Sequence, residues 1–186
     1  MASVLIPLAE GFEDLEAITI VDLLRRAGIE VVTAGLTPGP IKASRGTVVV
    51  PDASLDEALQ RDYDMVALPG GLPGADFLDS DPRIRTLLRA MAAADKYTAA
   101  ICAAPKVLAS AGLLEGKRAT SYPGALDDTA VTGLHYELAA VVCDGKVITS
   151  RGPGTAMDFA LTLIEALLGR AQRDAVEGPL QRPAAV

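Results

Sequence analysis

The stretch Ala99-Ala100-Ile101-Cys102-Ala103-Ala104-Pro105 joins a β-type run directly to a helix-compatible segment, with no loop between them. The β-type run extends from Tyr97 to Ile101, and the helical segment is expected to begin at Ala103 and Ala104. A strand that becomes a helix at one residue makes a sharp elbow and presents that residue at the carboxyl edge of a sheet. Amides at the start of the helix would favour an anionic sulfur there. Cys102 is therefore a candidate thiolate nucleophile, and the alternative is a buried cysteine that only fills space.

The overall composition is that of one globular domain covering residues 1–186. Of these 186 residues, 50% are hydrophobic, which suits a single sizeable core. The formal net charge is −7 and the sequence pI about 4.7, with acidic and basic residues interspersed, so we expect no nucleic-acid partner and no membrane partner. Because no segment approaches the apolar length that spans a bilayer, the default expectation is a soluble, cytoplasmic protein.

The cysteine and histidine content limits the chemistry. The chain has two cysteines, Cys102 and Cys143, and their separation fits neither a CxxC pair nor a zinc-type spacing. We therefore expect no structural disulfide, no metal site and a reducing compartment, with Cys143 a structural or exposed thiol. His135 is the single histidine, so any mechanism that needs an imidazole must use it.

Alternating apolar runs and amphipathic segments predict a doubly wound α/β fold, with a mainly parallel sheet and helices on both faces. Strands are expected at Ser3–Leu8, Ile29–Ala34, Gly46–Val50, Asp64–Leu68, Tyr97–Ile101 and Arg118–Ser121, and in a hairpin of Leu138–Cys143 and Lys146–Thr149. Helices are expected at Glu13–Ala27, Ser54–Gln60, Ala75–Leu78, Pro82–Ala94, Ala103–Ala111 and Ala156–Leu168. Residues 170–186 are expected to form a weaker helical turn followed by a tail.

Capping and turn residues support three of these boundaries. Ser54 and Glu57 have the spacing of a capping box, and Thr155 and Asp158 are expected to repeat it at the last helix. Asp144-Gly145 is expected to form the turn of the hairpin, because glycine accepts a positive φ.

Four of the expected strands end in residues that carry reactive groups. Carboxylates in Glu10–Glu16 follow the first strand, Gly70-Gly71 follow a buried strand, and Cys102 and Tyr122 follow two later ones. The carboxyl ends of parallel strands meet at one edge of a sheet, so we expect an acid, unhindered backbone amides, a sulfur and a phenol to converge there. Such a set can add a nucleophile to a carbonyl group.

Glu16 precedes the apolar face of the first helix and is expected to tip inward toward Cys102. Burial beside the sulfur would keep its carboxyl protonated, so that it could donate a hydrogen bond to a thiolate and later move a proton. Glu13 and Asp14 are interpreted as residues that complement the helix dipole. Arg151 either lies near the pocket as a cation or pairs with an acid elsewhere.

Several motifs spread along the chain occur together. They are Glu13-Asp14-Leu15-Glu16, Arg25-Arg26-Ala27-Gly28-Ile29, Pro51-Asp52-Ala53-Ser54-Leu55, Leu68-Pro69-Gly70-Gly71, Ala100-Ile101-Cys102-Ala103-Ala104-Pro105 and Thr149-Ser150-Arg151-Gly152-Pro153-Gly154-Thr155. In these motifs the chain resembles the ThiJ/PfpI superfamily, and closely its branch that contains the Parkinson-associated deglycase. The resemblance covers almost the whole chain.

The resemblance implies a flavodoxin-like homodimer in which Cys102 is a nucleophilic, easily oxidised cysteine. It also implies that Glu16 hydrogen-bonds the sulfur and that the amides of Gly71 and Ala103 form an oxyanion hole. The activities it implies are glutathione-independent conversion of methylglyoxal to lactate, repair of early glycation adducts, peroxide sensing through a cysteine sulfinate, and chaperone-like protection.

The chain departs from this branch at Tyr122, in a segment where relatives often have a histidine. A tyrosine can donate a hydrogen bond, but its phenol stays protonated at neutral pH and is a poor general base. Glyoxalase turnover would then be weak and depend on Glu16. His135 is expected to have a surface or structural role. Ala103 stands where peptidase-like members have a histidine directly after the nucleophile, so proteolysis is not expected.

Our leading hypothesis is a cofactor-free cysteine enzyme that acts on small α-oxoaldehydes or early glycation adducts. The residues assigned to it are the catalytic Cys102 and Glu16, the oxyanion-hole residues Gly71 and Ala103, and the substrate-orienting residues Tyr122, Gly70 and Arg151. One alternative is a redox-sensing or chaperone-like protein in which Cys102 is oxidised. Another is a simple cysteine esterase, which needs only a nucleophile and an oxyanion hole.

Overall fold

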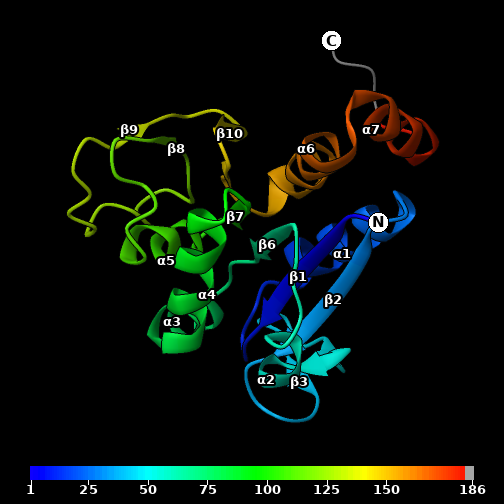
Figure 1. The fold of residues 1–186 in the computed structure, drawn as a ribbon, viewed down its shortest axis with the longest axis horizontal. Coiled ribbons are helices and arrows are strands. Elements are labelled where there is room, and N and C mark those ends of the chain that lie inside the picture. Colours follow the sequence, from blue (N-terminus) through cyan, green and yellow to red (C-terminus); the bar gives the residue numbers. More distant parts are fainter. Residues whose placement is uncertain (183–186) are drawn as a thin grey trace.

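A seven-stranded sheet forms the centre of the computed structural model, which describes residues 1–182 (Figure 1). In spatial order its strands are β10 (Val141–Asp144), β11 (Val147–Ser150), β7 (Tyr97–Ile101), β6 (Met65–Leu68), β1 (Ser3–Leu8), β2 (Glu30–Gly35) and β5 (Ala53–Ser54). Every neighbouring pair is parallel except β10 and β11. The expected doubly wound, mainly parallel sheet is therefore confirmed.

Helices cover both faces of this sheet. On one face, α1 (Asp14–Arg26) and α6 (Ala156–Leu168) pack against alternate strand residues such as Ile6, and α7 (Arg170–Glu177) packs on α6. On the other face, α2 (Leu55–Ala58), α4 (Pro82–Ala93) and α5 (Pro105–Ser110) pack against the intervening residues such as Leu5. Both faces of the central strands are buried, which explains why these strands are continuous apolar runs in the sequence.

Two expected strands lie outside the central sheet. Within Gly46–Val50 only β4 (Val48–Val49) is a strand, and it pairs with β3 (Ile41–Lys42). Within Arg118–Ser121 only β8 (Arg118–Ala119) is a strand, and it pairs with β9 (His135–Tyr136). Strand β5 occupies the sheet edge beside β2 instead. A two-residue strand carries no periodic pattern, so β5 could not be recognised from its residues.

The capping box at α2 is confirmed, whereas the one expected at α6 is wrong. Ser54 Oγ accepts a hydrogen bond from the Glu57 amide, and the Glu57 carboxylate accepts one from the Ser54 amide. Thr155 Oγ1 makes no capping bond to α6. It instead lies 2.7 Å from Ser150 Oγ and accepts a hydrogen bond from the Gly152 amide, because the chain makes a 3₁₀ turn at Pro153–Thr155 before the helix.

The hairpin turn and the C-terminal segment also differ from expectation. Asp144 pairs with Val147 in the ladder, so the turn consists of Gly145 and Lys146 rather than Asp144-Gly145. Residues 170–177 form the helix α7, in place of a weak turn and tail, and a 3₁₀ turn follows at Gly178–Leu180. The end of the expected tail, residues 183–186, lies outside the described residues.

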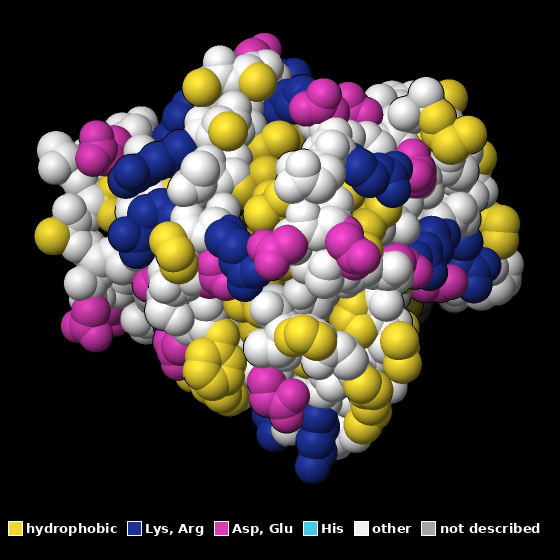
Figure 2. All heavy atoms as spheres, turned by 60° about the horizontal axis from the view of Figure 1, so that its bottom comes forward, with side chains coloured by type: hydrophobic (Ala, Val, Ile, Leu, Met, Phe, Trp, Pro, Cys, Tyr) yellow, Lys and Arg dark blue, Asp and Glu magenta, His cyan; other side chains and the backbone are white. Residues whose placement is uncertain are grey.

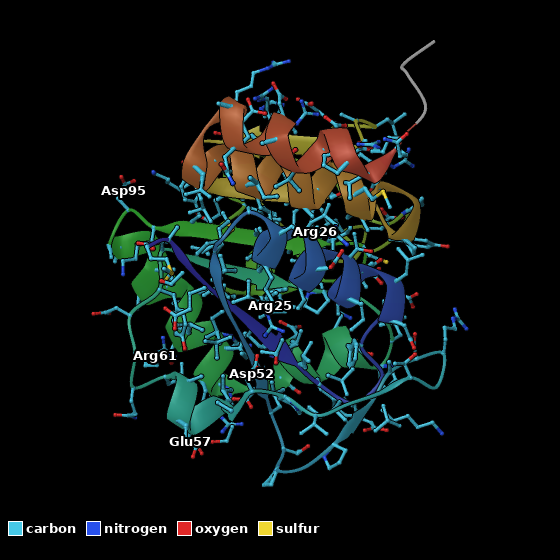
Figure 3. The ribbon with its side chains drawn as sticks, turned by 90° about the vertical axis from the view of Figure 1, so that its right-hand side faces the viewer. Arg25, Arg26, Asp52, Glu57, Arg61 and Asp95 are labelled. Carbon is cyan, nitrogen blue, oxygen red and sulfur yellow. The ribbon has the colours of Figure 1, made fainter. Side chains whose placement is uncertain are left out.

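Asp52, part of one of the motifs quoted above, has a structural role at the end of α1. Its carboxylate accepts hydrogen bonds from the amide and hydroxyl of Thr33, and it forms an ion pair of 2.8 Å with Arg25 (Figure 3). Burial acts to raise the pKa of Asp52, but the Thr33 hydrogen bonds and the Arg25 charge outweigh it and lower the pKa. The pair ties α1 to the segment that leads into β5.

The surface carries mixed charge. On the face drawn in Figure 2, basic and acidic side chains alternate with hydrophobic ones over the whole view. Among residues 1–182, every helix is too short or too polar to cross a bilayer.

Glycines allow the loops after β1 and β6 to pack backbone against backbone. Gly71 has a φ of +87°, and a Cβ built there would lie 2.4 Å from the Glu13 amide nitrogen. A Cβ on Gly74, the first residue of α3 (Gly74–Ser80), would lie 2.7 Å from the Phe12 nitrogen. The Glu13 amide also donates a 2.9 Å hydrogen bond to the Gly70 carbonyl. This contact fixes the start of α1 against the β6 loop.

We predict that Gly71→Ala destabilises the fold far more than Gly39→Ala. Gly39 has a similar φ of +89° but nothing within 4 Å of its Cβ position. Gly39→Ala therefore measures only the free-energy cost of a side chain at a positive φ. That cost is about 1–2 kcal/mol. The clash at Gly71 should add roughly 1–3 kcal/mol or more, as overpacking does. Urea denaturation of both variants measures the difference, and equal destabilisation would contradict the close contact.

Candidate functional site

Cys102 lies in a strained turn between β7 and α5. Its φ is +65°, a left-handed conformation that costs a non-glycine residue on the order of 1–3 kcal/mol. Its amide donates to the Ser150 carbonyl at 2.9 Å, and its carbonyl accepts from the Tyr122 amide at 2.8 Å. The sharp elbow is present, but the expected helix start at Ala103 is wrong. The chain makes a turn through Ala104, and α5 begins only at Pro105.

Glu16 reaches the same place from the first turn of α1 and is fully buried. Its Oε2 accepts a 2.8 Å hydrogen bond from the Gly70 amide, while its buried Oε1 has no hydrogen-bond partner among the described residues. A Cβ on Gly70 would lie 2.7 Å from Cys102 Cβ and 2.9 Å from Glu16 Oε2. The lack of a side chain at Gly70 therefore lets the carboxyl and the thiol approach each other.

The structure gives no support to the expected role of Gly70 in orienting substrate. Its amide is already used to hold Glu16, and Gly70 does not line the pocket beside Cys102. The sequence could not distinguish Gly70 from Gly71, because both follow the same strand and either amide could have pointed outward.

Burial raises the pKa values of both side chains of the pair. It raises the pKa of Glu16 to about 7, although hydrogen bonds from Gly70 and Cys102 act in the opposite direction. Burial, followed by the charge of Glu16 and its hydrogen bond, raises the pKa of Cys102 to about 12. Backbone hydrogen bonds from Gly71 and Ala103 to the sulfur act to lower it.

The expectation that nearby amides give Cys102 a low pKa is therefore wrong while Glu16 is ionised. Two amides cannot outweigh the loss of water together with a neighbouring carboxylate. Between pH values of about 7 and about 12, the pair holds one proton in common. When that proton is on Glu16, its carboxyl can donate to the sulfur, and the sulfur is then a thiolate.

A pocket of about 400 Å³ opens above the sulfur. It brings together Cys102, Gly71, Ala103 and Tyr122, four of the residues singled out in the sequence. The remaining lining residues are Glu13, Ser44, Arg45, Leu72 and Pro153. Larger hollows exist, including one of about 520 Å³ beside Phe77, but no cysteine lines that hollow.

One wall of this pocket is the turn between β3 and β4, which the sequence did not reveal. Ser44 Oγ donates a 2.7 Å hydrogen bond to Glu13, and Asp14 accepts from the amides of Arg45 and Thr47. Burial acts to raise the pKa of Asp14, but these hydrogen bonds outweigh it and lower the pKa. Glu13 and Asp14 thus do more than complement the helix dipole, because they hold the turn against α1.

Arg151 and His135 do not line the pocket. The Arg151 guanidinium donates to the Leu138 carbonyl at 3.4 Å, and the residue does not line the pocket, so the structure gives no support to its expected role in orienting substrate. His135 is exposed in β9, as expected of a surface residue. Cys143 is exposed in β10. Within residues 1–182, no three His, Cys, Asp or Glu side chains are grouped so that they could hold a metal ion.

We predict that the alkylation rate of Cys102 rises through a pH of about 7 in the wild type and then levels off. Loss of the first proton from the pair creates the thiolate population, and the second proton leaves only near pH 12. In Glu16→Gln the step near pH 7 should vanish. At pH 10 this variant should react faster than the wild type, because removing the carboxylate charge lowers the pKa of the thiol.

Mass spectrometry of iodoacetamide-treated protein measures both cysteines in one sample. Cys143 is the internal control, because it is exposed on β10 and should behave alike in both variants. Identical Cys102 profiles in the wild type and Glu16→Gln would contradict the shared proton.

Comparison with known proteins places this geometry in a family. Residues 2–166 match the DJ-1/PfpI family. The chain is 44% identical over 180 residues to the Parkinson disease protein 7 homolog of Danio rerio, covering 95% of each chain. It is 36% identical over 179 residues to the glutathione-independent glyoxalase DJR-1.2 of Caenorhabditis elegans, covering 96% of this chain and 95% of the relative.

Solved structures agree with this match. The crystal structure of Drosophila melanogaster DJ-1beta has a TM-score of 0.92 at 42% identity, and covers 98% of this chain and 99% of its own. Oxidized Toxoplasma gondii DJ-1 has a TM-score of 0.91 at 36% identity, and covers 99% of this chain and 100% of its own. These matches confirm the resemblance found in the motifs, and the chain belongs to the DJ-1/PfpI family.

Proposed function

We propose that this protein is a cofactor-free cysteine enzyme that converts α-oxoaldehydes to 2-hydroxy acids. The observation that carries the proposal is the fully buried Glu16 carboxyl, which lies across Gly70 from Cys102 and whose Oε1 has no hydrogen-bond partner within the described residues. Leaving a buried carboxyl oxygen without a hydrogen bond costs free energy, which calls for an explanation. Proton transfer to and from this oxygen during the reaction supplies one. The Caenorhabditis elegans relative is named a glutathione-independent glyoxalase, which supports the same reaction class.

In the proposed reaction, the Cys102 thiolate adds to the aldehyde carbon and forms a carbon–sulfur bond. In this proposal the amides of Gly71 and Ala103, which act to lower the pKa of Cys102, stabilise the hemithioacetal oxyanion. Glu16 first gives its proton to this oxyanion and so becomes a carboxylate. The carboxylate then removes the proton from that carbon and returns it to the neighbouring carbon, while the hydroxyl proton passes to the ketone oxygen. The former aldehyde carbon is thereby oxidised to a thioester while the ketone is reduced to an alcohol.

Water completes the reaction by hydrolysing the thioester, which releases the hydroxy acid and regenerates the thiol. A pKa of about 7 suits Glu16 to both proton transfers, because a group that titrates near the working pH can accept and donate a proton readily. Tyr122 lines the pocket but supplies no base at neutral pH, so in this proposal Glu16 is the single proton carrier.

We predict that the wild type produces lactate from methylglyoxal without glutathione and that Cys102→Ser abolishes this turnover. Glu16→Gln should lower kcat by roughly 10²- to 10⁴-fold, as loss of a general acid–base group does. Cys143→Ser is the matched control and should keep full activity, because Cys143 lies outside the pocket. Lactate formation that survives both site substitutions would rule out the proposed reaction.

Oxidation of Cys102 is a second candidate function. One solved relative at 36% identity is titled as an oxidized DJ-1. The Gly71 and Ala103 amides and a protonated Glu16 are donors that suit the oxygens of a sulfinate. In this reaction the thiolate attacks one peroxide oxygen to give a sulfenate and water, and a second peroxide oxidises the sulfenate to the sulfinate and releases a second water.

We predict that mild hydrogen peroxide adds two oxygens to Cys102 and leaves Cys143 unmodified. Cys143 is the more exposed thiol, but the structure gives its sulfur no comparable set of donors within residues 1–182. Peptide mass spectrometry distinguishes the two sites. Oxidation at Cys143 alone, or equal oxidation at both sites, would count against a sensor role.

A further inference from the structure

Tyr122 and Leu72 give the pocket an apolar surface that the protein itself leaves uncovered. Tyr122 is 53% exposed and Leu72 is 61% exposed, and both line the pocket that contains Cys102. The Tyr122 hydroxyl makes no hydrogen bond to any described residue, so no polar contact of the fold accounts for its position. Exposed apolar side chains that gather at a concave site commonly mark a surface for a ligand.

The backbone holds the Tyr122 ring close to the reactive sulfur. The Tyr122 amide donates a 2.8 Å hydrogen bond to the Cys102 carbonyl, which ties the two residues together. A Cβ built on Gly152 would lie 3.4 Å from Tyr122 Cδ2 and 4.0 Å from Cys102 Sγ. The space next to Gly152 is therefore bounded by the ring and by the sulfur, and it is free because Gly152 has no side chain.

The pocket is larger than a three-carbon oxoaldehyde requires. Its volume of about 400 Å³ falls within the range of about 300–1,000 Å³ that is usual for sites that enclose drug-sized ligands. Pro153 and Ala103 add further apolar surface around the sulfur. A substrate with a flat apolar substituent would fill this volume while its aldehyde carbon reached Cys102.

We propose that Tyr122 is a specificity-determining residue and that the site favours α-oxoaldehydes with an aromatic substituent. This inference rests on the proposed function and names its substrate class. The substituent packs on the Tyr122 ring in an offset-stacked or edge-to-face arrangement, and Leu72 covers its edge. For an arylglyoxal, the aldehyde carbon is oxidised to the carboxylate, the ketone carbon is reduced to the alcohol, and one water is consumed.

The test compares kcat/KM for phenylglyoxal and methylglyoxal, with mandelate and lactate as the measured products. The wild type should prefer phenylglyoxal. In Tyr122→Ala this preference should fall by roughly three- to tenfold, the usual worth of an aromatic pair, while Tyr122→Phe should retain it.

The outcomes separate this inference from the proposed function. If the wild type converts neither substrate, the proposed function fails and the inference fails with it. If the wild type converts both, but Tyr122→Ala keeps the same ratio of kcat/KM values as Tyr122→Phe, the role of Tyr122 in specificity is wrong while the proposed function stands. Circular dichroism spectra that match the wild type ensure that a loss of preference is not a loss of folding.

Discussion

The burial of the Glu16 carboxyl against the Cys102 thiol, across the backbone of Gly70, is the constraint on which the site depends. Removing a carboxyl from water is costly, and one oxygen of Glu16 receives no hydrogen bond from the described residues in return. Because burial disfavours the charged forms, it raises the pKa values of both groups. The pair therefore keeps a proton, which lowers the cost of burial. The reactivity of the sulfur is thus set by where one proton resides and not by an isolated low-pKa thiol.

The surrounding backbone is shaped to permit this contact. Gly70 leaves room between the acid and the thiol, and Gly71 lets the β6 loop pack directly on the start of α1. Cys102 adopts a positive φ, a conformation that its hydrogen bonds to Ser150 and Tyr122 hold in place. The positive φ of Cys102 and the burial of the Glu16 carboxyl both lower the stability of the fold. Packing of the surrounding sheet offsets this loss.

The main features were predictable because they rest on local patterns. Continuous apolar runs located the central strands, and a cysteine between Ile101 and Ala103 located the elbow. Features that depend on tertiary packing were not predictable. The Ser44-Arg45 wall is held by hydrogen bonds from residues about thirty positions away, and the direction of Arg151 depends on a carbonyl in a neighbouring segment. The thiol pKa was not predictable either, because burial and the carboxylate charge outweigh the two amides and both depend on tertiary packing.

The most direct measurement of the shared proton is a carbon-13 NMR titration of the Glu16 carboxyl carbon in the intact protein. The structure predicts a midpoint near pH 7, caused mainly by burial, so that the midpoint should stay raised in Cys102→Ser. An ordinary carboxyl midpoint of about 4.3 would mean that Glu16 is a solvated carboxylate at neutral pH, and would contradict the account.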